Sequence, residues 1–232
     1  MSSNTSTTAV SASPTPGTLA PPRIVGGIGG LVFVAVVVLQ NALRASAPKM
    51  DAATSAVVDY YADHHGLSFV LAATFVISGF GFATFAGALL DRLRAPQARG
   101  AALAGGVGLV GIFCLFSVTI AANLALAAYV HRGNPSTDVV DALWMLHNAV
   151  FIVLALAIGI ALAGLSASAS DQGLVAPVWR VVGLVGGLAS FVEVAFAPAI
   201  LDGSKVIAVG LVGFLTWLVF VATTSINLLR NR

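Results

Sequence analysis

Six long runs of apolar residues dominate this chain of 232 residues, and they constrain its fold more than any other feature. The runs cover residues 24–43, 67–90, 101–129, 142–165, 181–200 and 206–229. Each is long enough for an α-helix to cross about 30 Å of hydrocarbon at about 1.5 Å per residue. Backbone groups in lipid must be hydrogen-bonded within the segment, and the alternation typical of a membrane barrel is absent. The runs therefore predict six transmembrane helices.

Composition supports the same class of protein. Hydrophobic residues make up 58% of the chain and charged residues 9%, whereas soluble domains carry about 25% charged residues. So few charges cannot cover a surface that faces water. The formal net charge is only +2, and the sequence has no basic segment with interleaved aromatic residues. Both observations argue against nucleic-acid binding. We expect an all-α polytopic membrane helix bundle whose first partner is the lipid bilayer.

The chain contains a single cysteine, Cys114, inside the third apolar run. One cysteine excludes a disulfide within the chain, a Cys-x-x-Cys redox motif, a cysteine-rich zinc site and an iron–sulfur cluster. A small buried apolar role is the ordinary one for such a residue.

Residues 1–22 are rich in Ser, Thr, Ala and Pro and carry no charged side chain. Such a segment cannot bury enough apolar surface to offset its ordering entropy, so it predicts a disordered tail ahead of a six-helix domain at 23–230. An alternative is a signal peptide cleaved after Ala45-Ser46-Ala47. Its apolar run would exceed the usual 7–15 residues, which favours a retained first span.

The distribution of Lys and Arg predicts the orientation. With the N-terminus inside, the inner segments hold Arg23, Arg92, Arg94, Arg99, Arg180, Arg230 and Arg232, and the outer segments hold Arg44, Lys49, Arg132 and Lys205. This excess of positive charge favours cytoplasmic N- and C-termini. The richness in Ala, Val and Gly suggests a bacterium, so we expect the bacterial cytoplasmic (inner) membrane.

A short amphipathic helix is expected in the outer loop, between the first two spans. One face of the segment 51–65 is formed by residues at helical spacing, namely Val57, Tyr60, Tyr61 and His64. Asp51 is the expected N-cap. The pattern is typical of a helix that lies on the outer leaflet with its tyrosines at headgroup level.

The same loop contains residues that metals bind. Asp59 and Asp63 share a face and His64 and His65 follow, but spacing fixes no third ligand. We therefore predict solvated polar groups and no metal site.

Two glycine pairs, Gly26/Gly30 and Gly183/Gly187, have the GxxxG spacing that lets membrane helices approach closely. The sequence leaves open where they are used. They can pack helices within the bundle, or they can form the interface of a homo-oligomer or of a complex with another membrane protein.

Polar residues from three spans form a predicted layer in the outer half of the bundle. Asn123, His147 and Glu193 each lie about 10 Å below the outer boundary at helical rise, and Asn148 follows His147. An unpaired carboxylate is costly in hydrocarbon, and a nearby imidazole would relieve that cost. We expect Glu193 and His147 to be partners, with Asn123 or Asn148 completing the hydrogen bonds.

Several roles for this polar layer can be weighed. It can serve as a structural clamp between helices, as a binding site for a polar or lipidic ligand, as a proton pathway or as a catalytic site. The inner halves of the fourth and fifth spans are almost bare of polar residues, which argues against a channel. Gly-x-Ser-x-Gly, His-Glu-x-x-His, Gly-x-Gly-x-x-Gly and a second deep imidazole are absent, so no catalytic residue or cofactor is predicted.

Several short motifs carry a resemblance to a family. They are Leu146-His147-Asn148 at the fourth span, Val182-Gly183-Leu184-Val185-Gly186-Gly187 in the fifth, the loop 51–64, and Leu89-Leu90-Asp91-Arg92-Leu93-Arg94 after the second. Together they resemble an uncharacterised family of bacterial multi-pass membrane proteins, known as a domain of unknown function. The resemblance covers Ile24 to Leu229. It implies a six-helix membrane bundle and suggests that His147 matters, but it supplies no reaction.

The sequence thus favours a non-enzymatic integral membrane protein, an accessory or interaction subunit of a membrane assembly, with a polar pocket in the outer half of the bundle. The alternative is a transporter or receptor for a small polar or lipidic ligand that uses His147 and Glu193. An accessory subunit should carry small-residue stripes on its outside. A transporter or receptor should have a cavity that reaches the polar residues.

Overall fold

The computed structural model describes residues 22–94 and 99–230, and every regular element in these ranges is an α-helix. Six helices are long and apolar enough to cross a membrane: α1 (Pro22–Leu43), α3 (His65–Arg92), α4 (Arg99–His131), α5 (Thr137–Asp171), α6 (Val178–Ala195) and α8 (Ile207–Arg230). Two are short: α2 (Thr54–Asp63) and α7 (Ala197–Leu201). The all-α fold with six apolar helices is confirmed. The predicted disordered tail lies outside the described residues, apart from Pro22, which begins α1.

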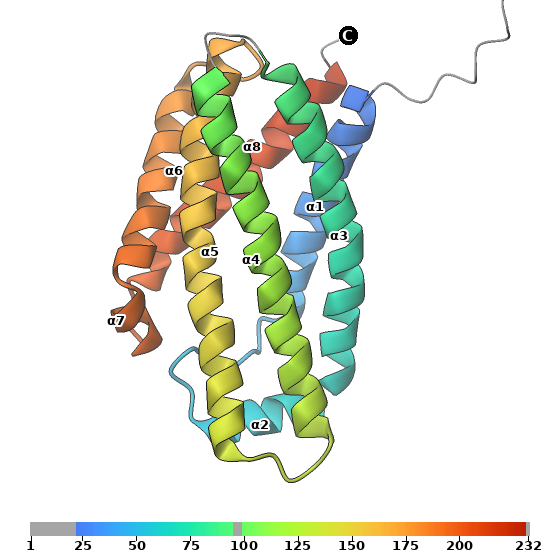
Figure 1. Cartoon of the computed structure of the whole chain (residues 1–232), viewed down its shortest axis with the longest axis vertical. Coiled ribbons are helices and arrows are strands. Elements are labelled where there is room, and N and C mark those ends of the chain that lie inside the picture. Colours follow the sequence, from blue (N-terminus) through green and yellow to red (C-terminus); the bar gives the residue numbers. More distant parts are fainter. Residues whose placement is uncertain (1–21, 95–98, 231–232) are drawn as a thin grey trace, which may run out of the picture.

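The long helices form an elongated bundle in which α4 and α5 lie side by side, α1 pairs with α3, and α6 pairs with α5 and α8 (Figure 1). α1 begins and α8 ends at the upper end of the view. α2 crosses the lower ends of α4 and α5, and α7 lies at the same lower end (Figure 1). Six crossings place both termini on the same side of the membrane. Since the termini are predicted to be cytoplasmic, the lower end of this view is the one predicted to face outside.

The fifth predicted span, 181–200, is not one continuous helix. α6 ends at Ala195, and Phe196 leaves helical geometry with φ −102° and ψ 18°. Pro198 stands in the first turn of α7. Because proline lacks a backbone N–H and its ring clashes with the preceding turn, it is tolerated at a helix start and not inside a helix. The chain therefore turns two residues before Pro198.

Glycines allow the closest helix contacts. An alanine Cβ at position 108 would lie 2.5 Å from the backbone N of Ala161 and 2.8 Å from the backbone O of Ala157, so α4 and α5 touch backbone to backbone. A Cβ at Gly187 would lie 3.0 Å from the carbonyl O of Gly159. Such approach is what small residues provide at membrane helix interfaces.

The predicted GxxxG pairs are used inside the chain. A Cβ at Gly26 would clash with Ala88, one at Gly30 with Ser225, and one at Gly183 with Ser166. All four glycines of the two pairs are buried. These faces are therefore already occupied by α3, α5 and α8, and they are not available to a second subunit.

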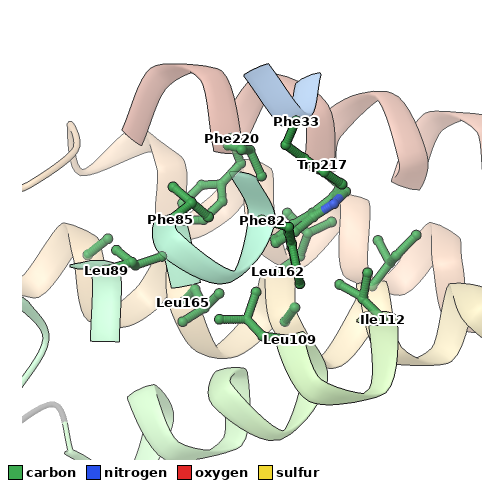
Figure 2. Packing of buried hydrophobic residues seen from close by; sticks show 14 of the residues in the cluster. Phe33, Phe82, Phe85, Leu89, Leu109, Ile112, Leu162, Leu165, Trp217 and Phe220 are labelled. Carbon is green, nitrogen blue, oxygen red and sulfur yellow. The ribbon is translucent and has the colours of Figure 1, made fainter. Parts of the chain in front are cut away.

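The main hydrophobic core fills the half of the bundle near the termini. Figure 2 shows side chains from α1, α3, α4, α5 and α8 interlocking there, with Phe82, Trp217 and Phe220 at the centre. The Trp217 ring lies 6.3 Å from that of Phe82 and 6.2 Å from that of Phe220, measured between centroids. The buried polar residues in this half are small hydroxyls, namely Ser166, Ser168, Thr224 and Ser225, whereas buried His147, Asn148 and Asn123 lie in the opposite half.

The outer surface of the bundle is apolar. Val76, Phe80 and Val107 are 70%, 73% and 67% exposed, and they belong to spanning helices. A soluble protein rarely exposes such continuous apolar surface, whereas a membrane protein presents it to lipid. The structure is that of a multi-pass membrane protein.

Candidate functional site: a polar pocket at the outer end

The end of the bundle opposite the termini, which we call the outer end after its predicted orientation, is covered by α2. Val57 and Tyr61 of this helix are fully buried, and they pack against Leu126, Val130, Val140 and Trp144 of α4 and α5. The amphipathic helix predicted in this loop therefore covers protein with its apolar face, instead of lying on the leaflet. The expected N-cap is also different, because α2 begins at Thr54 with Ala53 at the N-cap, and Asp51 stands apart.

Asn123 holds α2 in place. Its side-chain amide donates a hydrogen bond of 2.8 Å to the hydroxyl of Tyr61, deep between α4 and α2. Burial raises the pKa of Tyr61 to about 12, above the usual 10.0. Asn123 or Asn148 was expected to complete the hydrogen bonds of His147 and Glu193, and the structure pairs Asn123 with Tyr61.

His147 lies at the centre of a second polar cluster. Its ring is buried and stacks on Trp144, with centroids 5.3 Å apart and planes 4° from parallel. The guanidinium of Arg44 lies 3.2 Å from His147 Nε2, and Asn148 Oδ1 lies 3.2 Å from Nδ1. Because arginine only donates, Nε2 accepts and Nδ1 donates to Asn148. The expected His147–Asn148 bond is present.

This cluster ties together three segments that are far apart in the sequence. Arg44 follows α1, His147 and Asn148 belong to α5, and the Asn148 amide donates to the carbonyl O of Met50 in the outer loop at 3.5 Å. Arg44 is the partner of His147 that sequence reasoning missed. Its place directly after a span, on the predicted outer side, was the available signal.

Glu193 is buried elsewhere. Its carboxylate lies against Gly210 of α8, where a Cβ would clash with it. Within residues 22–94 and 99–230, no hydrogen bond or ion pair joins it to His147. The structure therefore does not bring the expected pair together.

The orientation of α6 about its own axis explains why Glu193 and His147 do not meet. Gly183 and Gly187 contact α5, whereas Gly186 and Ser190 lie against Thr216 and Gly213 of α8. Residues 186, 190 and 193 form one stripe at helical spacing, so Glu193 faces α8. The sequence predicted that Glu193 and His147 lie at the same depth in the membrane. Depth alone does not determine the direction in which a side chain points.

A cavity of about 540 Å³ opens beside His147. It lies between the end of α1, the loop after it, the start of α5, and the turn between α7 and α8. The residues that line it are Asn41, Arg44, Ala47, Pro48, Lys49, Met50, Asp51, Trp144, His147, Asn148, Phe151, Ile200, Gly203, Ser204, Lys205 and Ile207. We call it the outer pocket. Ligand pockets usually measure about 300–1,000 Å³.

The outer pocket is electropositive. Its polar lining includes the cations Arg44, Lys49 and Lys205 and one carboxylate, Asp51. In the part of the chain that the structure describes, the ion pairs are Arg94–Asp91 and Arg180–Asp171, so none of these four groups is neutralised by a partner. The rim residues Lys49, Asp51 and Lys205 are exposed, whereas His147 and Asn148 at its floor are buried.

The turn at Gly203 shapes the wall of the pocket. Gly203 has φ +88°, which favours glycine, and a Cβ there would meet the Asp51 carboxylate. The turn between α7 and α8 thereby packs against the outer loop. The break in the fifth span, which creates α7, thus brings Lys205 to the pocket.

The remaining histidines lie outside the pocket. His64 stacks on Tyr60 with ring centroids 4.4 Å apart, and His65 stacks on His131 at 3.8 Å. Over the described ranges, no three His, Cys, Asp or Glu side chains are placed to hold a metal ion together.

No family model, curated protein or solved structure matches this chain, so the site is defined by its own geometry.

Proposed function

We propose that this multi-pass membrane protein binds a small polar or lipidic ligand that carries negative charge, and that it holds this ligand in the outer pocket. The observation that carries the proposal is the cavity of about 540 Å³, which reaches buried His147 and Asn148 and is lined by three cations. A cavity that reaches the polar residues is what a receptor or transporter requires and what a structural clamp does not.

The pocket offers both polar and apolar contacts. The guanidinium of Arg44 carries several N–H donors, and one of them donates to His147. The remaining N–H groups can donate to an acidic group of a ligand. Lys49 and Lys205 stand at the rim, where they attract anions from a distance. Phe151, Ile200 and Ile207 provide an apolar wall. This combination favours a ligand with an acidic group attached to an apolar body.

Binding is favoured over conduction across the bundle. The core around Phe82, Trp217 and Phe220 fills the half of the bundle near the termini with tightly packed apolar side chains. Among the described residues, the buried polar side chains of that half are the uncharged hydroxyls of Ser166, Ser168, Thr224 and Ser225, whereas a path for protons or ions would need ionisable groups there.

An accessory subunit was the leading expectation from the sequence. It predicted small-residue stripes on the outside, but the two GxxxG pairs are buried against helices of the same chain. Membership of the bacterial family of unknown function remains a prediction, and it would name no ligand. Cytoplasmic termini and a bacterial inner membrane also remain predictions, supported by the excess of Lys and Arg at the end where the helical domain begins and ends.

The test is a thermal-stability screen of the purified chain against soluble anions and short-chain lipids. It should include carboxylates, phosphate esters and phosphatidic acid, each with a neutral analogue of equal size. We expect acidic compounds to raise the Tm and neutral analogues to leave it unchanged, because a ligand that binds the folded state stabilises it by mass action.

Lys205→Gln removes one rim charge without breaking a hydrogen bond among the described residues, so it should weaken binding several-fold while leaving the fold intact. Arg132→Gln is the matched control, since Arg132 is an exposed cation on the same side and does not line the pocket. Equal effects of the two variants, or equal binding of neutral analogues, would contradict the proposal.

A further inference from the structure

A second and larger cavity lies at the other end of the bundle, between α3 and α4. Its volume is about 920 Å³. Apolar residues of α4 form one wall, including Leu103, Gly106, Val107 and Val110, and Leu90 of α3 forms part of the other. We call it the α3–α4 groove. It shares no lining residue with the outer pocket.

The groove opens toward lipid. Leu103, Val107 and Val110 are 62%, 67% and 64% exposed, although they belong to a spanning helix. The helices separate here because α3 contacts α1 and α4 contacts α5 far more extensively than α3 and α4 contact each other. In a membrane, such a gap is filled by apolar groups, because water in it would be in unfavourable contact with the apolar lining side chains.

One end of the groove is positively charged. Arg94 and Arg99 line the end that is nearest the termini. Arg94 forms an exposed ion pair with Asp91 at 3.0 Å, and such pairs contribute little to stability. Arg99 makes no ion pair within the described residues. α4 also begins at Arg99, so the positive end of its dipole adds to the same field.

The length of the groove matches one lipid leaflet. From Arg99 to Gly111, the last lining residue on α4, the helix rises about 18 Å at about 1.5 Å per residue. Half of a hydrocarbon core measures about 15 Å. An acyl chain that starts at the arginines would thus run along the apolar wall to the middle of the membrane.

We propose that the α3–α4 groove is a binding site for an anionic phospholipid of the leaflet on the side of the termini. Arg94 and Arg99 bind its phosphate, and one acyl chain lies in the groove. Basic clefts between spanning helices bind acidic lipid headgroups by this charge complementarity. The site is independent of the ligand proposed for the outer pocket.

The test measures lipid retention by native mass spectrometry of the full-length protein, titrated with phosphatidylglycerol or with phosphatidylcholine of the same chains. We expect the anionic lipid to be retained more strongly than the neutral one. The double variant Arg94→Gln/Arg99→Gln should weaken phosphatidylglycerol binding about tenfold and phosphatidylcholine binding much less, because the choline group already balances the phosphate charge of that lipid. Arg230→Gln, which removes a charge at the same end outside the groove, should have no effect.

A second variant tests the groove itself. A Cβ at Gly106 would lie 3.5 Å from Leu90 Cδ2, which is ordinary contact, so a larger side chain there fills the groove without displacing backbone. Gly106→Leu should reduce retention of phosphatidylglycerol although both arginines remain, and Gly106→Ala should not.

Three results would overturn the proposal: equal retention of the two lipids, equal retention by the double variant and Arg230→Gln, or competition by soluble glycerol 3-phosphate as effective as that by the lipid. The last would make the site one for a free phosphate ester. Lys205→Gln should leave this binding unchanged, so failure here and failure at the outer pocket are separate outcomes.

Discussion

Tyr61 and Asn123 show how single polar residues hold the outer end of this bundle together. The Tyr61 hydroxyl is buried and accepts a hydrogen bond of 2.8 Å from the Asn123 amide. Removing the hydroxyl by Tyr61→Phe leaves a buried amide donor without its partner, which costs about 1–3 kcal/mol. We expect that loss in the free energy of unfolding measured in detergent. Tyr129→Phe is the control, because the Tyr129 hydroxyl accepts only an exposed bond from Ser136 N. Equal, small losses in the two variants would contradict this role for Asn123.

Alkaline pH should destabilise the folded state through the same tyrosine, because ionisation would place a buried negative charge on its phenol. Burial raises the pKa of Tyr61 to about 12 from 10.0. The folded state thus holds the phenol proton more tightly than the unfolded state does. The resulting stability is complete below pH 10 and is lost as the pH rises through 12. A shift of this size corresponds to about 2–3 kcal/mol.

The measurement is the difference in free energy of unfolding between wild type and Tyr61→Phe, followed from pH 9 to pH 12. The comparison cancels the ionisation of the other tyrosines, and the difference should shrink as the pH rises. A difference that stays constant over this range would show that the phenol titrates alike in both states.

At the residue scale, the sequence predicts which side chains are unusual better than which ones meet. His147 and Asn148 follow each other on one helix, and their expected bond is present. Glu193 belongs to another helix, and its direction depends on how α6 rotates against α5 and α8. The rotation of α6 depends on close backbone contacts such as the one between Gly187 and Gly159. A pattern within one segment of the sequence does not predict which glycines meet.

At the scale of elements, the α4–α5 contact should be the least tolerant of added volume. Gly108→Ala would place a methyl group 2.5 Å from a backbone atom of Ala161, and neither helix can move without losing its other contacts. Overpacking of this kind costs about 1–3 kcal/mol. Gly87→Ala is the matched control, because a Cβ there meets nothing within 4 Å and alanine favours helix. Thermal unfolding in detergent should show a lower Tm for Gly108→Ala and an unchanged or higher Tm for Gly87→Ala. The reverse order would contradict the backbone contact.

Six apolar helices follow from hydropathy because length and composition suffice to define a membrane span. The end of the fifth span was misplaced, since the apolar run continues through Phe196 and Ala197 while Pro198 interrupts the helix. The helical face of α2 was correct, but its partner was not. Val57 and Tyr61 fit a leaflet or a protein surface equally well by pattern, and only the tertiary fold brings α4 and α5 beneath them.

At the scale of the whole molecule, the large apolar side chains and the buried amide and imidazole groups lie in different halves of the bundle, and the polar residues buried in the half near the termini are the hydroxyls of Ser166, Ser168, Thr224 and Ser225. The half near the termini is a dense core, and the opposite half holds the Asn123, His147 and Arg44 contacts and the outer pocket. The outer pocket is thus confined to one end of the bundle, which supports binding of its ligand from a single side of the membrane. The side concerned depends on the orientation of the chain, which the excess of Lys and Arg predicts.

That orientation is testable with single cysteines in a Cys114→Ser background, which is needed because Cys114 is exposed on α4 and not buried as its sequence context predicted. Ser55→Cys lies on the exposed face of α2, and Ala176→Cys lies exposed in the turn before α6, at the opposite end. If the termini are cytoplasmic, a membrane-impermeant maleimide applied to intact cells should label Ser55→Cys, and it should label Ala176→Cys only after lysis. The opposite pattern would place the outer pocket in the cytoplasm. Because both positions carry small, exposed side chains, a difference in labelling would report the side of the membrane and not a difference in burial.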